Sequence, residues 1–186
     1  MIIKDYQLIN SINSELFQSF LIYGPNEGLI RENIDIVYKN FSKGADCEKI
    51  NINGKQLDES ISILNDEIST ISLFSEKKFI ILDSPKEKHV SIIENSLSLD
   101  FKNTCMVVKQ DNLTKSSSIR KLYETSKNHF CLACYDDDIK VLSSLLEKFQ
   151  KEHSITFDSD VKSFLLNNLS NDRMVIKNEL EKILLA

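Results

Sequence analysis

Short apolar runs alternate with amphipathic stretches over roughly the first three quarters of the chain. Runs of this length, with few polar residues, are typical of strands that are buried on both faces. They are Phe20–Tyr23, Cys47–Asn51, Lys78–Leu82, Thr104–Val108 and His129–Ala133. Helical patterns lie between them, at about Gly28–Phe41, Gln56–Ser69, Glu87–Leu97 and Ser116–Ser126. This alternation, without tight hairpin signals, predicts an α/β fold with a mostly parallel five-stranded sheet and flanking helices.

The pattern changes after Tyr135. The acidic segment 136–138 can cap a following helix, and apolar residues then recur at helical spacing in three segments. The apolar positions are Val141, Leu142, Leu145, Leu146 and Phe149, then Val161, Phe164, Leu165 and Leu169, then Ile176, Leu180, Ile183 and Leu184. We therefore predict an α/β domain over residues 1–138 and a small three-helix lid over residues 139–186.

Composition narrows the class of protein. The chain has 186 residues, 41% of them hydrophobic, and a formal net charge of −5. It contains no apolar run near the roughly 20 residues that span a bilayer and no secretory signal, so we expect no membrane and a cytoplasmic location. The negative charge argues against a free-standing DNA-binding module, which is normally basic, although contact with DNA inside a larger assembly stays open.

Four cysteines raise the question of a metal or redox site. Cys131 and Cys134 form a C-x-x-C, and Cys47 and Cys105 are isolated. The pair lies in an apolar run, where residues three apart on a strand point to opposite faces. No second C-x-x-C completes a set of four ligands. We therefore expect reduced core cysteines and no metal.

The segment from Phe20 to Arg31 has the form of a nucleotide-binding phosphate loop, because an apolar strand enters a glycine turn and then a helix. The working pattern G-x-x-x-x-G-K-[ST] needs a second glycine, a lysine for the phosphates and a hydroxyl for magnesium. Counted from Gly24, these positions hold Leu29, Ile30 and Arg31. Either this is a phosphate loop that has lost its chemistry, or the turn Gly24–Gly28 only joins a strand to a helix.

A second degenerate motif follows in the expected order. An ATPase would carry an apolar strand that ends in Asp-Glu, with the aspartate on magnesium and the glutamate activating water. Here the strand ends at Asp83, and Ser84-Pro85 follows, so the general base is missing. An aspartate at the end of a strand is also common in inert folds.

The segment Thr70-Ile71-Ser72-Leu73-Phe74 lies between a predicted helix and a predicted strand. It is similar to the clamp-binding peptide of bacterial replication proteins, in which a glutamine precedes a short variable pair and Leu-Phe. Two adjacent large apolar side chains can fill a hydrophobic pocket on a partner. Thr70 stands where glutamine is usual. The alternative is that Leu73 and Phe74 are core residues at the start of the strand.

Taken in order, these motifs resemble the delta subunit of the bacterial DNA polymerase III clamp loader. The resemblance also uses Asn112–Lys115, Ile119–Leu122, Tyr135–Asp137 and, in the helical part, Asn171–Arg173 and Lys177–Lys182. It covers essentially the whole chain.

The resemblance implies an AAA+-like fold without ATPase activity or a cofactor, and a non-catalytic subunit of the polymerase III holoenzyme. It implies binding to the beta sliding clamp and help in opening it for loading on primed DNA. Implied partners are the gamma/tau and delta-prime subunits, with primed DNA met only in the assembly. A helical collar domain normally follows the lid in this family, and we expect it to be missing from this chain.

Two other interpretations remain. An active P-loop or AAA+ enzyme would need a Gly-Lys-Ser/Thr triplet, which occurs nowhere in the sequence. A delta-prime-like loader subunit would usually carry a Ser-Arg-Cys tripeptide, which is also absent.

Overall fold

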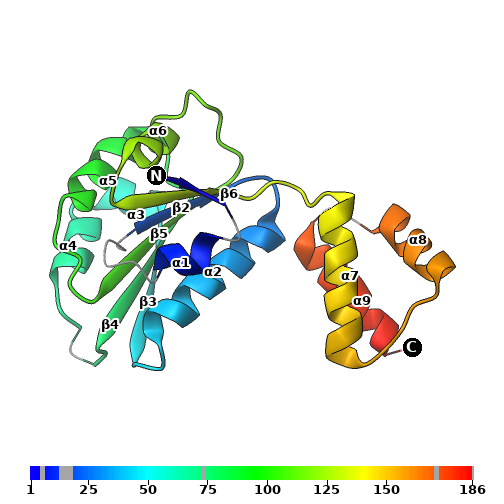
Figure 1. Ribbon diagram of the computed structural model, residues 1–186. Coiled ribbons are helices and arrows are strands. Elements are labelled where there is room, and N and C mark those ends of the chain that lie inside the picture. Colours follow the sequence, from blue (N-terminus) through cyan, green and yellow to red (C-terminus); the bar gives the residue numbers. More distant parts are fainter. Residues whose placement is uncertain (5–6, 13–18, 73, 170–171, 186) are drawn as a thin grey trace. The chain divides into compact units, whose positions relative to one another are not determined.

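Parallel strands form the central sheet in a computed structural model that describes residues 1–4, 7–12, 19–72, 74–169 and 172–185. These residues form six strands in the order β1-β6-β2-β5-β4-β3 (Figure 1). The strands are β1 (Ile2–Ile3), β2 (Ser19–Tyr23), β3 (Cys47–Asn53), β4 (Lys77–Asp83), β5 (Thr104–Gln110) and β6 (His129–Ala133).

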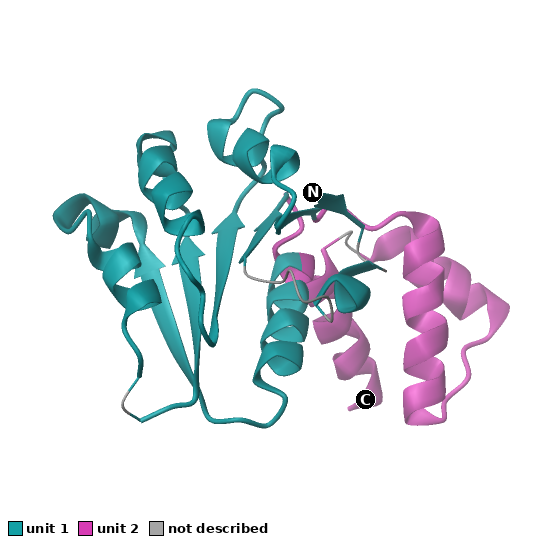
Figure 2. Ribbon diagram, turned by 60° about the vertical axis from the view of Figure 1, so that its left-hand side comes forward, with its two compact units in different colours: residues 1–24, 30–133 teal, residues 25–29, 134–186 magenta. Residues whose placement is uncertain are grey.

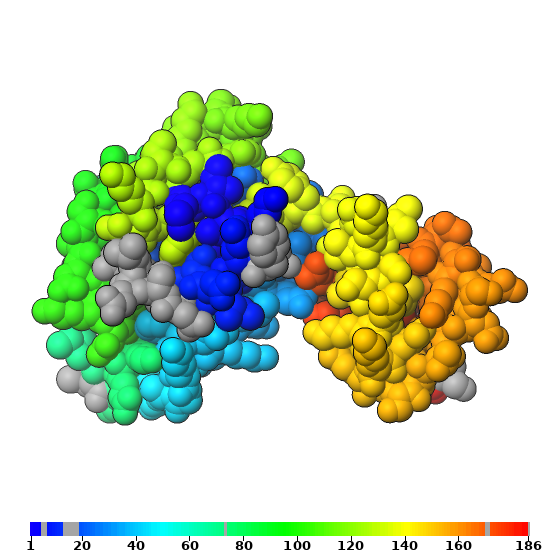
Figure 3. Space-filling model, viewed as in Figure 1, coloured from blue at the N-terminus to red at the C-terminus, as the bar shows by residue number. Residues whose placement is uncertain are grey.

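The predicted fold class is confirmed, but the sheet has six strands where the sequence predicted five. The additional strand is β1, in which Ile2 pairs with Cys131 and Ile3 with Leu132. In the space-filling view the N-terminal segment, in dark blue, lies on the surface beside the yellow-green segment that carries β6 (Figure 3). Two residues are too few to show a strand periodicity, so the pattern of the sequence could not indicate β1.

The helices around the sheet follow the predicted positions with three changes, the first of which is that α1 (Leu8–Ile12) was not predicted. The other helices are α2 (Glu27–Ser42), α3 (Gly54–Glu59), α4 (Ile63–Ser69), α5 (Val90–Leu97) and α6 (Ser118–Thr125). The single helix predicted over 56–69 is two helices, because Ser60 takes an extended conformation at the end of α3. A short 3-10 turn, η2 (Glu87–His89), precedes α5.

Both faces of the sheet are covered. On one face, buried side chains of α3, α4, α5 and α6 pack with alternate residues of the central strands. This cluster includes Leu57, Leu64, Ile68, Ile93, Ile119 and Tyr123 from the helices and Leu21, Ile52, Ile80, Leu82, Met106 and Val108 from the strands. On the opposite face the ring of Phe79 meets Tyr38 and Phe41 of α2, at centroid distances of 5.3 and 6.3 Å. Burial of large apolar side chains on both faces explains why the strands are nearly continuous apolar runs.

The chain divides into two compact units (Figure 2). Unit 1 is Met1–Gly24 with Ile30–Ala133, and unit 2 is Pro25–Leu29 with Cys134–Ala186. Unit 2 therefore contains the C-terminal helices together with the end of the glycine turn and the first residues of α2, which the sequence analysis had placed with the sheet.

The helices of unit 2 are α7 (Ile139–His153), α8 (Ser159–Asn168) and α9 (Arg173–Leu184). Their core consists of Leu142, Leu146, Phe149, Leu165, Ile176 and Leu180. The acidic segment before α7 caps it as predicted, since Asp138 Oδ1 accepts a hydrogen bond from Val141 N at 2.9 Å. All six of these core residues are among the apolar positions that the sequence predicted. Other predicted positions are exposed instead, including Val161 and Phe164 of α8 and Ile183 and Leu184 of α9.

Candidate functional site

Two large apolar side chains project from the loop between α4 and β4. Ile71 is 85% exposed and Phe74 is 90% exposed. Leu73, the other predicted anchor, lies outside the described residues. A phenylalanine with this exposure is not a core residue, so the alternative interpretation of Phe74 does not hold.

The start of this loop is held by a buried lysine of β4. Lys78 Nζ donates hydrogen bonds to Glu67 O at 3.0 Å, to Glu67 Oε2 at 3.2 Å and to Thr70 Oγ1 at 2.9 Å. Thr70 Oγ1 in turn donates to Asp66 O at 2.7 Å. Thr70, which stands where the related peptides have glutamine, therefore bonds to the chain's own helix α4.

The end of the loop is held from the other side. Glu76 N and Lys77 N both donate to Asp46 O, at 3.1 and 3.2 Å, and Lys77 Nζ donates to Phe41 O at 2.6 Å. Within the loop, Phe74 N donates to Ser72 Oγ at 3.4 Å. The base is fixed by hydrogen bonds while Ile71 and Phe74 face solvent, which is the arrangement of a pre-ordered binding loop.

The turn between β2 and α2 is the second predicted site. Gly24, at φ 150°, follows β2 directly, and α2 begins at Glu27. The side chain of Leu29 is 6% exposed and that of Ile30 only 1% exposed. The position that a working loop gives to the phosphate-binding lysine is thus an apolar residue inside the core.

Backbone N–H groups of this turn donate within the protein. Gly24 N donates to Gln110 O at 3.3 Å, and Asn26 N to Cys134 O at 3.2 Å. Leu29 N donates to Asn26 Oδ1 at 2.9 Å, and Gly28 N to Asp172 Oδ2 at 3.2 Å. In a nucleotide-binding loop such amides point at phosphate oxygens.

Asp83 ends β4, as predicted, at the same edge of the sheet as Gly24. Its Oδ1 accepts a hydrogen bond from Ser84 Oγ at 2.8 Å and lies 3.8 Å from Lys109 Nζ. No glutamate follows it, since Ser84 occupies the next position with φ 51°. Arg31, the last residue of the degenerate motif, begins the second turn of α2 and is exposed.

A polar cluster lies beside α3. Asp58 Oδ1 accepts from Lys88 Nζ at 2.5 Å and from His89 Nε2 at 2.8 Å. The hydrogen bond from Lys88 and then that from His89 lower the pKa of the Asp58 carboxyl to about 2. Buried His89 also accepts from Lys86 N through Nδ1 at 3.1 Å, so one ring nitrogen caps η2 and the other joins η2 to α3.

No disulfide joins the four cysteines, all of which are described residues, and all but Cys47 are buried. Burial raises the pKa of the Cys131 thiol to about 12, so it stays protonated at neutral pH. Cys131 lies in β6, whereas Cys134 follows the strand. Within the described ranges, no three His, Cys, Asp or Glu side chains are grouped so as to hold a metal ion.

The sequence analysis missed the polar residues that link the turn to α9. Arg173 makes a bidentate pair with Asp137, Nη2 to Oδ1 at 2.7 Å and Nε to Oδ2 at 3.0 Å. Arg173 N also donates to Asn26 Oδ1 at 3.2 Å. Apart from the capping role of segment 136–138, the sequence analysis used Tyr135–Asp137 and Asn171–Arg173 only as parts of the resemblance, and nothing local marked which residues they contact.

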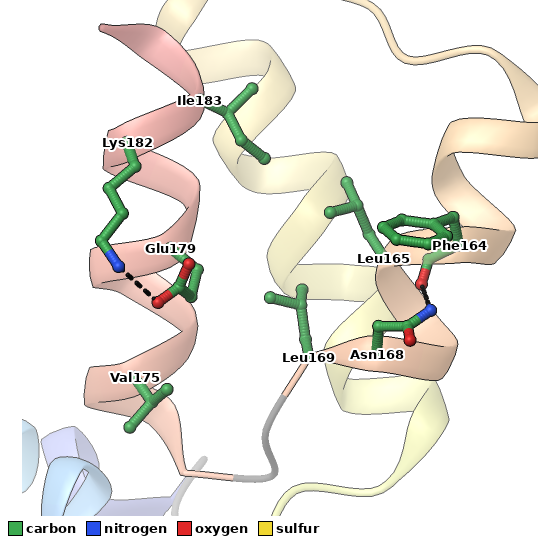
Figure 4. Close-up of a pocket in the computed structure, with 8 residues that line it drawn as sticks. All are labelled: Phe164, Leu165, Asn168, Leu169, Val175, Glu179, Lys182 and Ile183. Atoms are coloured by element: carbon green, nitrogen blue, oxygen red, sulfur yellow. Dashed lines mark hydrogen bonds and ion pairs between the residues drawn. The ribbon is translucent and has the colours of Figure 1, made fainter. Parts of the chain in front are cut away.

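Unit 2 also carries an apolar groove between α8 and α9, with a volume of about 610 Å³. Figure 4 shows its lining: Phe164, Leu165, Asn168, Leu169, Val175, Glu179, Lys182 and Ile183.

Over the part of the chain that the structure describes, no helix is long and apolar enough to cross a membrane.

Comparisons of the sequence with known proteins match this chain to a protein family and to a curated relative. The family model described as DNA polymerase III, delta subunit, matches residues 20–154. A curated relative, the probable DNA polymerase III subunit delta of Rickettsia prowazekii (strain Madrid E), is 25% identical over 182 residues, which are 96% of this chain and 53% of the relative. This chain thus spans about half the length of that protein.

Solved structures share the fold. The DNA clamp loader delta protein of Bacillus subtilis matches with a TM-score of 0.62 and 16% identity, over 95% of this chain and 56% of that one. A DNA polymerase III gamma subunit-related protein of Thermotoga maritima matches with a TM-score of 0.57 and 14% identity, over 95% and 57%. These likenesses establish an AAA+-like fold, as the sequence predicted.

Proposed function

Because this chain belongs to the DNA polymerase III delta subunit family, we propose that it is the subunit of a clamp loader that binds the beta sliding clamp. The loop of residues 70–76 is the binding element, with Phe74 as the main anchor, Ile71 beside it and Leu73 included from its place in the sequence. Thr70 and Ser72 flank the anchors.

The exposure of Phe74 on an anchored loop is the observation that carries this proposal. Burial of a large apolar side chain is worth roughly 1.5–3 kcal/mol, and aromatic anchors at the centre of an interface are typical hot spots. Fixed ends reduce the entropy that the loop loses on binding. The loop therefore suits insertion into a preformed apolar pocket.

Clamp opening follows from differential binding. A subunit that binds the open ring more tightly than the closed ring shifts the population toward the open ring, and needs no chemical step of its own. We propose this role during loading on primed DNA in the cytoplasm, in a complex with the gamma/tau and delta-prime subunits. With a net charge of −5 the chain itself is not expected to hold DNA outside that assembly.

We further propose that the chain neither binds nor hydrolyses ATP. The buried Ile30 in place of a lysine supports this, as does the use of loop amides for internal hydrogen bonds. Calorimetric titration with Mg-ATP is expected to show no binding. Micromolar affinity would contradict the proposal and favour an active AAA+ enzyme.

The clamp-binding proposal is tested with Phe74→Ala, using Phe164→Ala as a matched control. Phe164 is also an exposed phenylalanine, 65% exposed, but lies on α8. Loss of a hot-spot anchor of about 2 kcal/mol raises the Kd for the clamp about 30-fold. The control is expected to leave the Kd unchanged.

Thermal denaturation of both variants completes the experiment. Since Phe74 is exposed, its replacement is expected to change the unfolding midpoint very little. A Phe74→Ala protein that binds the clamp as tightly as the parent would refute the assignment of the loop.

A further inference from the structure

Two side chains of unit 2 accept hydrogen bonds from the first turn of α2, which is part of that unit, and from the first turn of α9. Asn26 Oδ1 accepts from Leu29 N of α2 at 2.9 Å and from Arg173 N of α9 at 3.2 Å. Asp172 accepts from Gly28 N of α2 through Oδ2 at 3.2 Å. Each side chain thus bonds to the first turn of both helices, although the two lie far apart in the sequence.

Asp172 also caps its own helix. Its Oδ1 accepts from Met174 N at 2.9 Å and from Val175 N at 3.1 Å. One carboxylate oxygen therefore accepts from amides at the start of α9, and the other accepts from an amide at the start of α2. An asparagine at position 172 would have an NH₂ group in place of one of these oxygens, so it could not accept at both places in this way.

Gly28 allows this close approach. A Cβ atom at this position would lie 2.2 Å from Met174 N, 2.9 Å from Met174 Cβ and 3.0 Å from Asp172 Oδ1. The backbone of α9 thus rests directly on the glycine turn. The glycine is explained by this contact and needs no phosphate to account for it.

Electrostatics favours a negative charge between the two helix starts. The N-terminus of a helix carries a partial positive charge of about half an elementary charge, so two of them repel each other at short range. A carboxylate that accepts hydrogen bonds from both satisfies their amides and offsets the repulsion. Phosphate has the same combination of charge and acceptor oxygens when it binds at a helix N-terminus.

We propose that the Asp172 carboxylate is a built-in ligand of the degenerate phosphate loop, occupying the place that a nucleotide phosphate takes in an active relative of this fold. The turn and α9 are then held together without nucleotide. This inference goes beyond clamp binding and does not rest on it, so a negative clamp-binding result leaves it intact.

The decisive variant is Asp172→Asn. Asparagine is as good an N-cap as aspartate, so its oxygen keeps the bonds to Met174 and Val175. Its NH₂ group, however, cannot accept from Gly28 N. Loss of one hydrogen bond of this kind corresponds to about tenfold faster amide exchange.

Amide hydrogen exchange measured by NMR is the readout. In the Asp172→Asn protein we expect the Gly28 amide to exchange about tenfold faster, while Met174 and Val175 keep their protection. Asp158→Asn is the matched control, because Asp158 is the N-cap residue of α8 and its side chain makes no capping bond. The control is expected to leave Gly28 protection unchanged.

A second variant tests the anion directly. Asp172→Ala removes the carboxylate, and added sodium formate is expected to restore part of the Gly28 protection, whereas sodium chloride at equal ionic strength is not. Unchanged Gly28 exchange in Asp172→Asn overturns the proposal. So does an equal rise in exchange at all amides of α9, or formate that protects no better than chloride.

Discussion

Replacement of Arg173 by methionine is expected to destabilise unit 2 strongly. Arg173 and Asp137 form a bidentate ion pair whose side chains are only 10% and 4% exposed. Removal of the guanidinium leaves the carboxylate buried without its partner, which typically costs about 3–5 kcal/mol. Lysine is not an adequate substitute, because it cannot reproduce the two parallel N–H···O bonds.

A double-mutant cycle separates the pair from general packing. Asp137→Leu alone leaves a buried guanidinium, so it should also cost several kcal/mol, whereas the combination with Arg173→Met removes both charges. The double variant is therefore expected to lose at least about 2 kcal/mol less than the sum of the two single losses.

Urea titrations followed by circular dichroism provide the assay, with Lys182→Met as the control. Lys182 pairs with Glu179 on the same helix α9 at 2.6 Å, but these side chains are 68% and 46% exposed. Such a surface pair is worth no more than about 0.5 kcal/mol. The reasoning is refuted if Arg173→Met costs no more than the control, or if the two losses at the buried pair simply add.

Three further outcomes are expected. Gly28→Ala should lower the free energy of unfolding by about 1–3 kcal/mol, because its Cβ would overlap Met174 N, and urea titration against the parent measures this. Asp58 has a depressed pKa of about 2 in the folded protein, so its contribution to stability is present above its unfolded pKa of about 3.9 and is lost as the pH falls through about 2. The fall in stability between about pH 4 and 2 should accordingly be shallower in Asp58→Asn, and an unchanged slope would contradict this. Lys78→Met removes the bond that holds Thr70, so the Kd for the clamp is expected to rise about threefold to tenfold in a binding titration, with equal affinity arguing against a pre-ordered loop.

The local pattern of apolar and polar residues was sufficient to predict most of the helices and strands. The strand at His129–Ala133 was predicted to the residue, and the periodicity of α7 identified its buried side chains, because regular elements that bury a face must repeat their apolar positions. The pattern failed where an element was too short or was interrupted. Strand β1 has only two residues, and the break at Ser60 between α3 and α4 falls inside one continuous helical pattern.

The sequence alone also shows that the second glycine, the lysine and the hydroxyl of a working phosphate loop are missing, since this requires only the identities of Leu29, Ile30 and Arg31. It could not determine whether Phe74 is a core or a surface residue. An apolar side chain next to a strand satisfies both interpretations, and only the folded loop shows that Phe74 faces solvent.

Only the tertiary structure showed which polar contacts the glycine turn and the start of α9 make. Asp172 reaches Gly28 across 144 residues of sequence, and Arg173 reaches Asp137 across 36. Hydrogen bonds and ion pairs are specified by atomic positions within a few tenths of an ångström, and such positions leave no periodic signal in a sequence. The periodicity of apolar residues was thus enough to predict most helices and strands of this protein. The polar contacts between α9 and the glycine turn could be identified only in the tertiary structure.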